Sequence, residues 1–358
     1  MQFAQRKVGV EEIARFADRL DVRSPAEFAL DHLPRARSAP VLNDAARAAI
    51  GTLHAKVSGF AARKAGAAIV ARNIATIIDT IAADKPLGWA PLIYCWRGGQ
   101  RSRSLAHVLG EIGFGAMQLD GGYRAWRRHV VAQLDVLPAR LRLVVVCGLT
   151  GSGKSRLVQA LAAAGAQALD LEALARHRGS LLGDEPGNPQ PSQRHFETGI
   201  FDVLSGFALD KPIFVESESK RIGKLQVPEA LLAAMRRAHC IRVDTGLPLR
   251  VRLLLDDYPH WCLDAGALNA RLAPLAVLHG KATIARWQEA ATRGEFGELV
   301  AELLALHYDP SYSRSIERNF THMADAPAIA PQGADRESFS VLAREAISIA
   351  DNFITSGH

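Results

Sequence analysis

Short apolar runs alternate with segments of helical periodicity in the first part of the chain. Leu92-Ile93-Tyr94 leads directly into Cys95, and Met117-Gln118-Leu119 is followed by the turn signal Asp120-Gly121-Gly122. Both runs have the length of buried strands, and such alternation favours a parallel sheet covered by helices. We therefore expect an α/β domain over residues 1–135, with helices on both faces of its sheet.

The second part begins with a new strand pattern. The β-branched run Leu143–Cys147 stops at Gly148, and a helix-forming stretch follows over residues 154–164. A second apolar strand is expected at Ile213–Val215. Beyond residue 247 the periodicity is mainly helical, so this domain is expected to end in a helical section.

A boundary between the two domains is expected just before this strand. Pro138 discourages a continuous helix there. We place a second α/β domain over residues 141–358, giving two domains in a chain of 358 residues. With 48% hydrophobic and 22% charged residues, the composition is that of an ordinary soluble protein with room for two cores.

Charge and hydropathy restrict the expected cellular location and the expected binding partners of the protein. Charged residues precede any apolar run at the N-terminus, and no run of about 18 uncharged apolar residues occurs, so we expect a cytoplasmic protein without a membrane segment. Residues 1–140 carry 20 Lys and Arg against 12 Asp and Glu, within a net charge of +6. A polyanion would meet this half first, although an ordinary solvated surface explains the numbers equally well.

A phosphate-binding motif follows the strand at residues 143–147. Gly148-Leu-Thr-Gly-Ser-Gly-Lys154-Ser155 fits G-x-x-x-x-G-K-[ST] between a strand and a helix, a context that a chance Gly-rich turn rarely has. Backbone N–H groups and the helix N-terminus attract an anion, Lys154 neutralises phosphate charge, and Ser155 can ligate Mg²⁺. The motif indicates a bound phosphate or diphosphate and does not establish ATP hydrolysis. The candidate ligands are Gly148, Thr150, Gly151, Ser152, Gly153, Lys154 and Ser155.

Two pairs of acidic residues compete for the metal side of this motif. Glu216 and Glu218 follow the expected strand at Ile213–Val215, and Asp170 and Glu172 follow Gln167-Ala168-Leu169. A salt-linked strand end explains Glu216 and Glu218 equally well, and the sequence does not choose between the two pairs.

A second loop carries a candidate nucleophile. Cys95-Trp-Arg-Gly-Gly-Gln-Arg101-Ser102 places a cysteine at a strand end before a Gly-rich turn and a helix. Loop N–H groups, the helix N-terminus, Arg97 and Arg101 favour a thiolate at Cys95. A cysteine phosphatase uses a similar pattern, but Tyr94 stands where those enzymes usually have histidine. No Cys-x-x-Cys pair occurs, and we interpret the other cysteines as structural: Cys147, Cys240 and Cys262.

Several segments together resemble a known family. Asp21–Phe28, Asp31–Pro34, the Cys95–Arg101 loop and Leu119–Trp126 resemble a rhodanese domain. Joined to a P-loop in this order, they resemble tRNA 2-selenouridine synthases, and the resemblance covers nearly the whole chain. Further matching segments are Asp170–Glu172, His177–Ser180, Gln190–Gln193, Val215–Ser219, Arg221–Gly223 and His307–Pro310.

The resemblance implies a two-step reaction on a wobble uridine of tRNA. It implies conversion of 2-thiouridine to 2-selenouridine, with selenophosphate as the selenium donor and an S-geranyl intermediate made from geranyl diphosphate. A selenophosphate-supplying enzyme is then a partner, and no permanently bound cofactor is expected. The P-loop suits the diphosphate, and Cys95 suits the selenium step.

Two further sets of residues are candidates for substrate contact. Arg124, Arg127 and Arg128 share a helical face, and with Tyr123 they can contact tRNA, although neighbouring Trp126 can equally be a core residue. His177, Arg178, Ser192 and Gln193 are candidates for polar loops near the diphosphate or the base, with ordinary helix caps as the alternative.

Two other functions remain open from the sequence. An ATP-dependent tRNA thiolation enzyme would use the P-loop to activate a uridine oxygen. A regulatory protein would use the cysteine loop as a redox or oxyanion sensor and the P-loop as a nucleotide switch.

Overall fold

The computed structural model describes residues 7–311 and 318–355 of the chain. It divides into two compact units, which are described separately. Unit 1 comprises residues 1–133 and 191–202, and unit 2 comprises residues 134–190 and 203–358.

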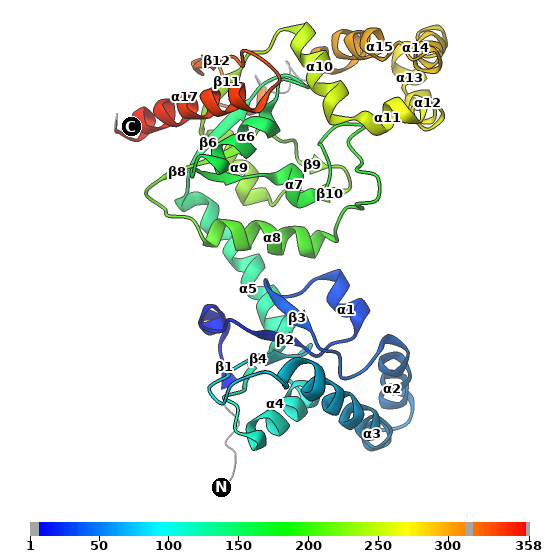
Figure 1. The fold of residues 1–358 in the computed structure, drawn as a ribbon, viewed down its shortest axis with the longest axis vertical. Helices are drawn as coiled ribbons and strands as arrows, with labels where there is room; N and C mark the ends of the chain where they lie inside the picture. Colours follow the sequence, from blue (N-terminus) through cyan, green and yellow to red (C-terminus); the bar gives the residue numbers. More distant parts are fainter. Residues whose placement is uncertain (1–6, 312–317, 356–358) are drawn as a thin grey trace. The chain divides into compact units, whose positions relative to one another are not determined.

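Unit 1 is built on a five-stranded parallel sheet (Figure 1). The strand order β1-β5-β4-β2-β3 places β4, which leads into Cys95, at the centre. Its elements are β1 (Lys7–Val8), η1 (Val10–Arg15), β2 (Arg19–Asp21), α1 (Pro25–Leu30), β3 (Ala36–Ser38), α2 (Asp44–Lys56), α3 (Gly59–Ile77), η2 (Ile78–Ala82), β4 (Leu92–Tyr94), α4 (Gln100–Ile112), β5 (Met117–Leu119) and α5 (Gly122–Val136).

The core of unit 1 lies between its strands and helices. Leu20 and Ile93 from β2 and β4 pack with Ile77 at the end of α3 and with Leu105 and Leu109 of α4. All these side chains are buried, as the continuous apolar runs predict for a parallel sheet.

One helical stretch of unit 1 is long and apolar enough, by composition, to span a membrane. It covers Gly59–Ala82 and is the one such stretch among the residues described. Its second half supplies Ile74, Ile77 and Ile81 to the core of unit 1. Core packing therefore accounts for the apolar character of that half.

Unit 2 is also built on a five-stranded parallel sheet, in the order β12-β11-β6-β8-β7. The central strand β6 leads into the P-loop. The elements from residue 137 onward are η3 (Leu137–Arg140), β6 (Arg142–Cys147), α6 (Lys154–Ala163), β7 (Gln167–Leu169), α7 (Leu171–Ala175), α8 (Gln193–Ser205), β8 (Pro212–Glu216), β9 (Arg221–Ile222), β10 (Leu225–Gln226), α9 (Glu229–Arg237), β11 (His239–Val243), α10 (Leu247–Asp257), α11 (Pro259–Leu263), α12 (Ala265–Leu272), η4 (Ala273–Leu275), α13 (Ala276–His279), α14 (Lys281–Arg293), α15 (Phe296–Leu303), η5 (Leu304–Tyr308), β12 (Ala328–Ile329) and α17 (Arg336–Thr355).

Two apolar clusters hold unit 2 together. Val146 of β6 and Phe214 of β8 pack against Leu161 of α6 and Leu342 of α17. A second cluster, centred on the fully buried Trp287, joins the helices from α12 to α15. The expected parallel sheets and helical C-terminal section are confirmed, and the strands at residues 92–94 and 117–119 begin and end where the apolar runs do.

The chain returns to unit 1 after entering unit 2. Residues 191–202, which include most of α8, belong to unit 1 by their contacts. Phe201 packs edge-on against Trp126 of α5, and Thr198 donates a hydrogen bond to Asp31. A single domain boundary between residues 135 and 141 does not predict that residues 191–202 belong to unit 1.

Candidate active site

The Cys95 sulfur of unit 1 lies among hydrogen-bond donors. The backbone N–H of Gly99 and the hydroxyl of Ser102 each reach Sγ at 3.2 Å. Gln118 donates to the Ser102 oxygen at 2.7 Å and so orients this hydroxyl. Cys95 is only 3% exposed, but its sulfur faces the start of α4 and these donors. The loop therefore directs hydrogen-bond donors at this sulfur.

The segment after β5 closes around the cysteine loop. The backbone N–H of Tyr123 donates to the Cys95 carbonyl at 2.8 Å, and that of Arg124 donates to the Trp96 carbonyl at 3.0 Å. This approach requires Gly122, whose φ is +59° and whose added Cβ would lie 2.3 Å from the Cys95 carbonyl oxygen. The sequence Asp120-Gly121-Gly122 therefore positions the loop as well as forming a turn.

The two arginines of the loop differ in their surroundings. Arg101 donates to Glu27 of α1 at 3.0 Å, so its charge is matched by a carboxylate. Arg97 is exposed, and no ion pair involves it within the described residues. Of the two, Arg97 is the arginine left to meet an anionic substrate.

The other three cysteines lie outside this loop. Cys147 and Cys240 are buried on adjacent strands of unit 2, where contact with Cys240, together with burial, raises the pKa of the Cys147 thiol. Cys262 is partly exposed, and burial raises its pKa.

The P-loop of unit 2 occupies the turn between β6 and α6. The ammonium group of Lys154 donates to the carbonyl oxygens of Gly148 at 2.9 Å and Leu149 at 3.1 Å, and burial lowers its pKa. The hydroxyl oxygens of Thr150 and Ser152 are buried without a protein partner. These groups and the N-terminus of α6 suit a phosphate.

The structure shows that one residue of each acidic pair lines the P-loop pocket. Glu172 accepts a hydrogen bond from Ser155 at 2.6 Å, and Glu172 and Glu218 both line the P-loop pocket. Glu216 is fully buried and accepts from the Glu172 backbone, while Asp170 caps α7. Burial, with the neighbouring Glu172 charge, raises the pKa of Glu218 to about 8. No group of three or more metal-ligating side chains occurs in the described ranges.

The four candidate loop residues belong to two different units. Arg178 lines the P-loop pocket, with its guanidinium 5.2 Å from the ring centroid of Tyr258. His177 is 5% exposed and faces Asp184, which makes it a structural residue of its loop. Ser192 and Gln193 belong to unit 1, where Ser192 caps α8, whereas the P-loop belongs to unit 2. Sequence spacing does not reveal that the chain has crossed back.

Sequence reasoning missed an ion pair that supports the P-loop. Arg250 of α10, 4% exposed, donates to the Thr150 carbonyl at 2.9 Å and forms a two-point ion pair with Asp309. Asp309 lies in the segment His307–Pro310, which had been noted only as part of the family resemblance. A buried arginine on an otherwise amphipathic helix was the available signal.

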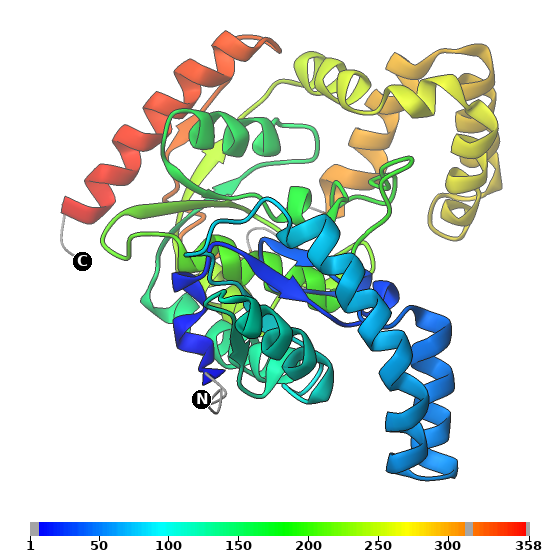
Figure 2. The same cartoon turned by 60° about the horizontal axis from the view of Figure 1, so that its bottom comes forward.

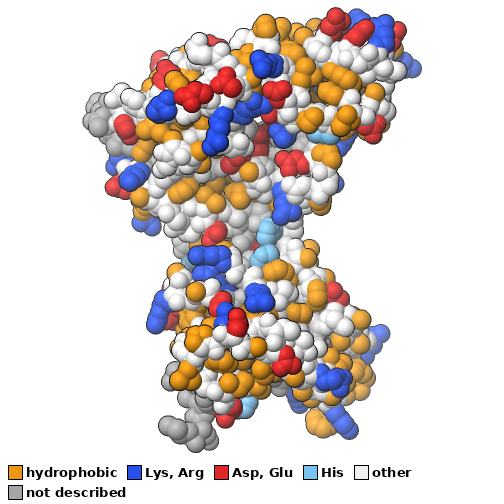
Figure 3. Space-filling view, in the orientation of Figure 1, with side chains coloured by type: hydrophobic (Ala, Val, Ile, Leu, Met, Phe, Trp, Pro, Cys, Tyr) orange, Lys and Arg blue, Asp and Glu red, His pale blue; other side chains and the backbone are white. Residues whose placement is uncertain are grey.

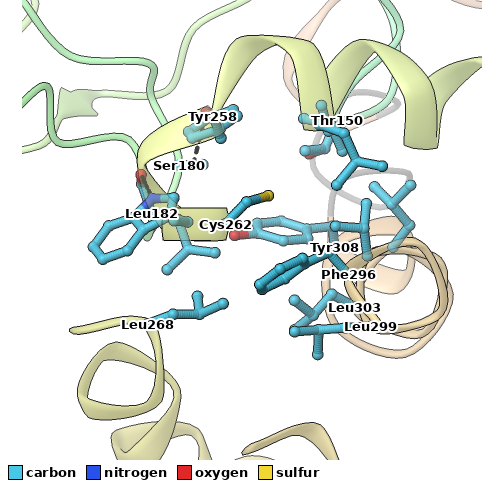
Figure 4. Close-up of a pocket in the computed structure, with 15 residues that line it drawn as sticks. Thr150, Ser180, Leu182, Tyr258, Cys262, Leu268, Phe296, Leu299, Leu303 and Tyr308 are labelled. Atoms are coloured by element: carbon cyan, nitrogen blue, oxygen red, sulfur yellow. Dashed lines mark hydrogen bonds between the residues drawn. The ribbon is translucent and has the colours of Figure 1, made fainter. Parts of the chain in front are cut away.

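An apolar pocket adjoins the polar P-loop pocket, and Figure 4 shows its lining. Leu268, Phe296, Leu299, Leu303 and Tyr308 form much of its wall, and their side chains point into a common space in Figure 4. The two pockets share four lining residues: Thr150, Ser180, Leu254 and Tyr258. Unit 2 therefore has an anion-binding pocket and an apolar pocket that share part of their lining.

The expected tRNA-binding cluster on α5 is only partly available. Tyr123 and Trp126 are 2% and 4% exposed, so neither can stack on a base, and Trp126 is the core residue that the alternative interpretation expected. Arg127 pairs with Glu197 within unit 1. Arg124 and Arg128 remain exposed.

The fold and the two loops define a class of protein in which a rhodanese-like domain precedes a P-loop domain. Family models described as "Rhodanese-like domain" and "tRNA 2-selenouridine synthase AAA domain" match residues 12–129 and 141–270. The chain belongs to the tRNA 2-selenouridine synthase family.

Three relatives illustrate the similarity, and each is a tRNA 2-selenouridine synthase. The one from Bdellovibrio bacteriovorus is 33% identical over 344 residues, covering 84% of this chain and 89% of the relative. The one from Chromohalobacter salexigens is 33% identical over 330 residues, covering 84% and 88%. The one from Nitrosomonas europaea is 34% identical over 250 residues, covering 67% and 63%.

Proposed function

We propose that this protein converts 2-thiouridine at the wobble position of tRNA to 2-selenouridine. Selenophosphate is the selenium donor, and S-geranyl-2-thiouridine, made from geranyl diphosphate, is the intermediate. Family membership supports the overall reaction on tRNA. We place the reaction in the cytoplasm, where tRNA substrates are found.

The observation that carries the geranyl step is the pair of pockets in unit 2 that share part of their lining. Geranyl diphosphate has a charged head and a hydrocarbon tail. The head matches Lys154, the P-loop N–H groups and Arg178, and the tail matches the leucine-rich pocket that begins at Thr150 and Tyr258. Burying hydrocarbon stabilises binding by about 0.8 kcal/mol per CH₂ group. A nucleotide would leave this apolar wall unused.

In the first step, the sulfur of 2-thiouridine attacks C1 of the geranyl group. The C–S bond forms as the C–O bond to diphosphate breaks, and the base releases its N3 proton. Negative charge accumulates on the departing diphosphate oxygen, where Lys154 and the N-terminus of α6 stabilise it.

In the second step, selenium replaces the alkylated sulfur. Water cleaves the Se–P bond of selenophosphate to give phosphate, hydroselenide and a proton. Selenium adds to C2 of the base and its proton passes to N3. The C–S bond breaks to release geranylthiolate, which takes up the proton from the hydrolysis. We assign this step to the Cys95 loop, because Gly99, Ser102 and the start of α4 offer donors to an anion. Alkylation makes the sulfur a better leaving group than a thiocarbonyl sulfur.

Magnesium fits the P-loop end of the site. Ser155 Oγ and Glu172 Oε2, which lie 2.6 Å apart, are the oxygen donors that Mg²⁺ prefers. Two protein donors suit an ion that keeps its remaining positions for water and phosphate oxygens. When bound, Mg²⁺ would neutralise charge on the diphosphate.

The test compares Cys95→Ala and Lys154→Ala on thiolated tRNA, with both co-substrates present and nucleosides quantified by mass spectrometry. Cys95→Ala should accumulate S-geranyl-2-thiouridine and lose 2-selenouridine at least 100-fold. Lys154→Ala should lose both products, yet form 2-selenouridine from tRNA that is already geranylated. Cys240→Ala and Lys220→Ala are the matched controls.

Two results would contradict the proposal. If Lys154→Ala geranylates normally, the P-loop does not hold the prenyl donor. If product formation requires ATP and releases pyrophosphate in a tRNA-dependent manner, the chain is a thiolation enzyme of the adenylating kind.

A further inference from the structure

Helices α2 and α3 of unit 1 form a hairpin, here called the helical arm (residues 44–77), whose far end is exposed. Both views show the two helices side by side, and Figure 2 shows them extending away from the sheet of unit 1. Within residues 44–68, only Ala62 and Gly66 are buried. Gly66 permits close packing, since a Cβ there would lie 3.1 Å from Cδ1 of Ile50. The end of the arm therefore adds little to the core.

The charge of the arm is almost entirely positive. Lys56, Arg63, Lys64 and Arg72 are exposed, and none forms an ion pair within the described residues. The single acidic residue of the two helices is Asp44, at the base of the arm. Figure 3 shows Lys and Arg side chains together with apolar ones over this part of unit 1. An unpaired positive surface of this kind complements a polyanion.

Exposed apolar side chains lie beside these charges at the turn between the helices. Val57 is 68% exposed and Phe60 is 69% exposed. On α3, Phe60, Arg63 and Lys64 have the i, i+3, i+4 spacing that places side chains on one helical face. An aromatic ring flanked by cations can stack on an unpaired base while the cations contact phosphates.

We propose that the tip of the helical arm (residues 54–64) is an RNA-binding site of this protein. Lys56, Arg63 and Lys64 contact phosphates of the substrate tRNA, and Phe60 stacks on an unstacked base. The inference rests on the proposed function only in taking tRNA as the substrate. The tip of the arm would supply phosphate contacts to the tRNA. Helix α5 is poorly suited to supply them, because Arg127 is paired and Tyr123 is buried.

An anionic membrane surface is the competing occupant. The exposed face of α3 beyond the tip consists largely of alanines, Ala65, Ala67, Ala68 and Ala71, which bury little area in lipid. Large apolar side chains are confined to Val57 and Phe60. The arm therefore matches RNA better than a bilayer.

The experiment measures binding of a tRNA transcript with a wobble uridine between 50 and 200 mM salt, a range in which the loss of phosphate contacts changes the affinity strongly. The triple variant Lys56→Ala, Arg63→Ala, Lys64→Ala should bind at least tenfold more weakly at the lower salt. Its slope of log K against log salt should be shallower by roughly 2, at about 0.7–0.9 per lost contact. Phe60→Ala should weaken binding roughly tenfold with an unchanged slope, and Phe60→Trp should restore it.

The matched control removes three exposed basic side chains of unit 2, in Lys211→Ala, Lys281→Ala, Arg336→Ala. The proposal is overturned if the arm variant binds tRNA as tightly as the wild type, or if the control variant loses as much tRNA affinity as the arm variant. It is also overturned if the arm variant loses binding to anionic phospholipid vesicles instead of to tRNA. Circular dichroism verifies that the variants fold. If the wild-type protein does not bind tRNA, the proposed function fails; if it binds and the arm variant binds equally, only the arm assignment fails.

Discussion

At the scale of single residues, the Cys95 loop and the P-loop differ in the groups that they offer to a substrate. Cys95 receives hydrogen bonds from Gly99 and Ser102, so its loop presents hydrogen-bond donors. Lys154 donates to carbonyl oxygens of its own loop, so the P-loop presents positive charge to an anion. One loop thus suits a nucleophilic or anion-handling step, and the other suits a departing diphosphate.

The raised pKa of Glu218 predicts a pH-dependent stability. Its pKa of about 8 in the folded state lies above the ordinary value of 4.5, because burial and the Glu172 charge oppose ionisation. The unfolded chain therefore loses this proton first, and the free energy of unfolding falls as the pH rises between these values. Glu218→Gln removes this loss, so its Tm advantage over the wild type should grow from pH 5 to pH 8.

Thermal unfolding of the ligand-free protein at several pH values is the measurement. Glu345→Gln, an exposed position on α17, is the control and should give a constant difference from the wild type. A constant difference for Glu218→Gln as well would show that this carboxyl is ionised throughout the range.

At the scale of elements, the helices after residue 247 build the apolar end of the site. Leu254 of α10, Leu268 of α12 and Leu299 of α15 come from separate helices and line one pocket. The helical section thereby adds a binding surface to the strand-loop-helix that holds phosphate.

A bulky residue in this wall should discriminate between prenyl chains. Val300 of α15 is partly buried and lines the pocket, so Val300→Phe fills space assigned to the geranyl tail in the proposed function. Losing room for two or three carbon groups costs about 2 kcal/mol, so the KM for geranyl diphosphate should rise about 30-fold. Dimethylallyl diphosphate, whose tail is shorter, should be affected much less.

Steady-state prenylation of thiolated tRNA with the two diphosphates provides the comparison. Val341→Phe, at an exposed position of α17, is the control for an added ring. Equal KM changes for both donors would place the tail elsewhere.

At the scale of the whole molecule, unit 1 is completed by a segment from far along the chain. Asp31, buried after α1, accepts hydrogen bonds from Tyr123 at 2.7 Å and from Thr198 of α8 at 3.1 Å. Tyr123 also donates its backbone N–H to Cys95. The same buried carboxylate thus connects the cysteine loop to residues 191–202.

Thr198→Val should loosen this segment. It removes one hydrogen bond to a buried carboxylate, which costs about 1–3 kcal/mol, so hydrogen exchange of the α8 amides should accelerate roughly 5- to 150-fold. Exchange followed by mass spectrometry tests this, with the exposed Thr52→Val of α2 as the control. Unaltered exchange in α8 would mean that Phe201 and its apolar neighbours hold the segment alone.

The sequence by itself determined the local parts of this protein. The runs at residues 92–94, 117–119 and 143–147, the P-loop and the Cys95 loop are each contiguous, so periodicity, glycines and helix starts within about fifteen residues specify them. Only the tertiary structure decided that Glu172 and Glu218 face the pocket, that Arg250 pairs with Asp309, that Arg127 is paired, and that Ser192 lies in unit 1. These outcomes depend on side chains that are distant in sequence and become neighbours only when helices and sheets pack, and no local pattern records that packing.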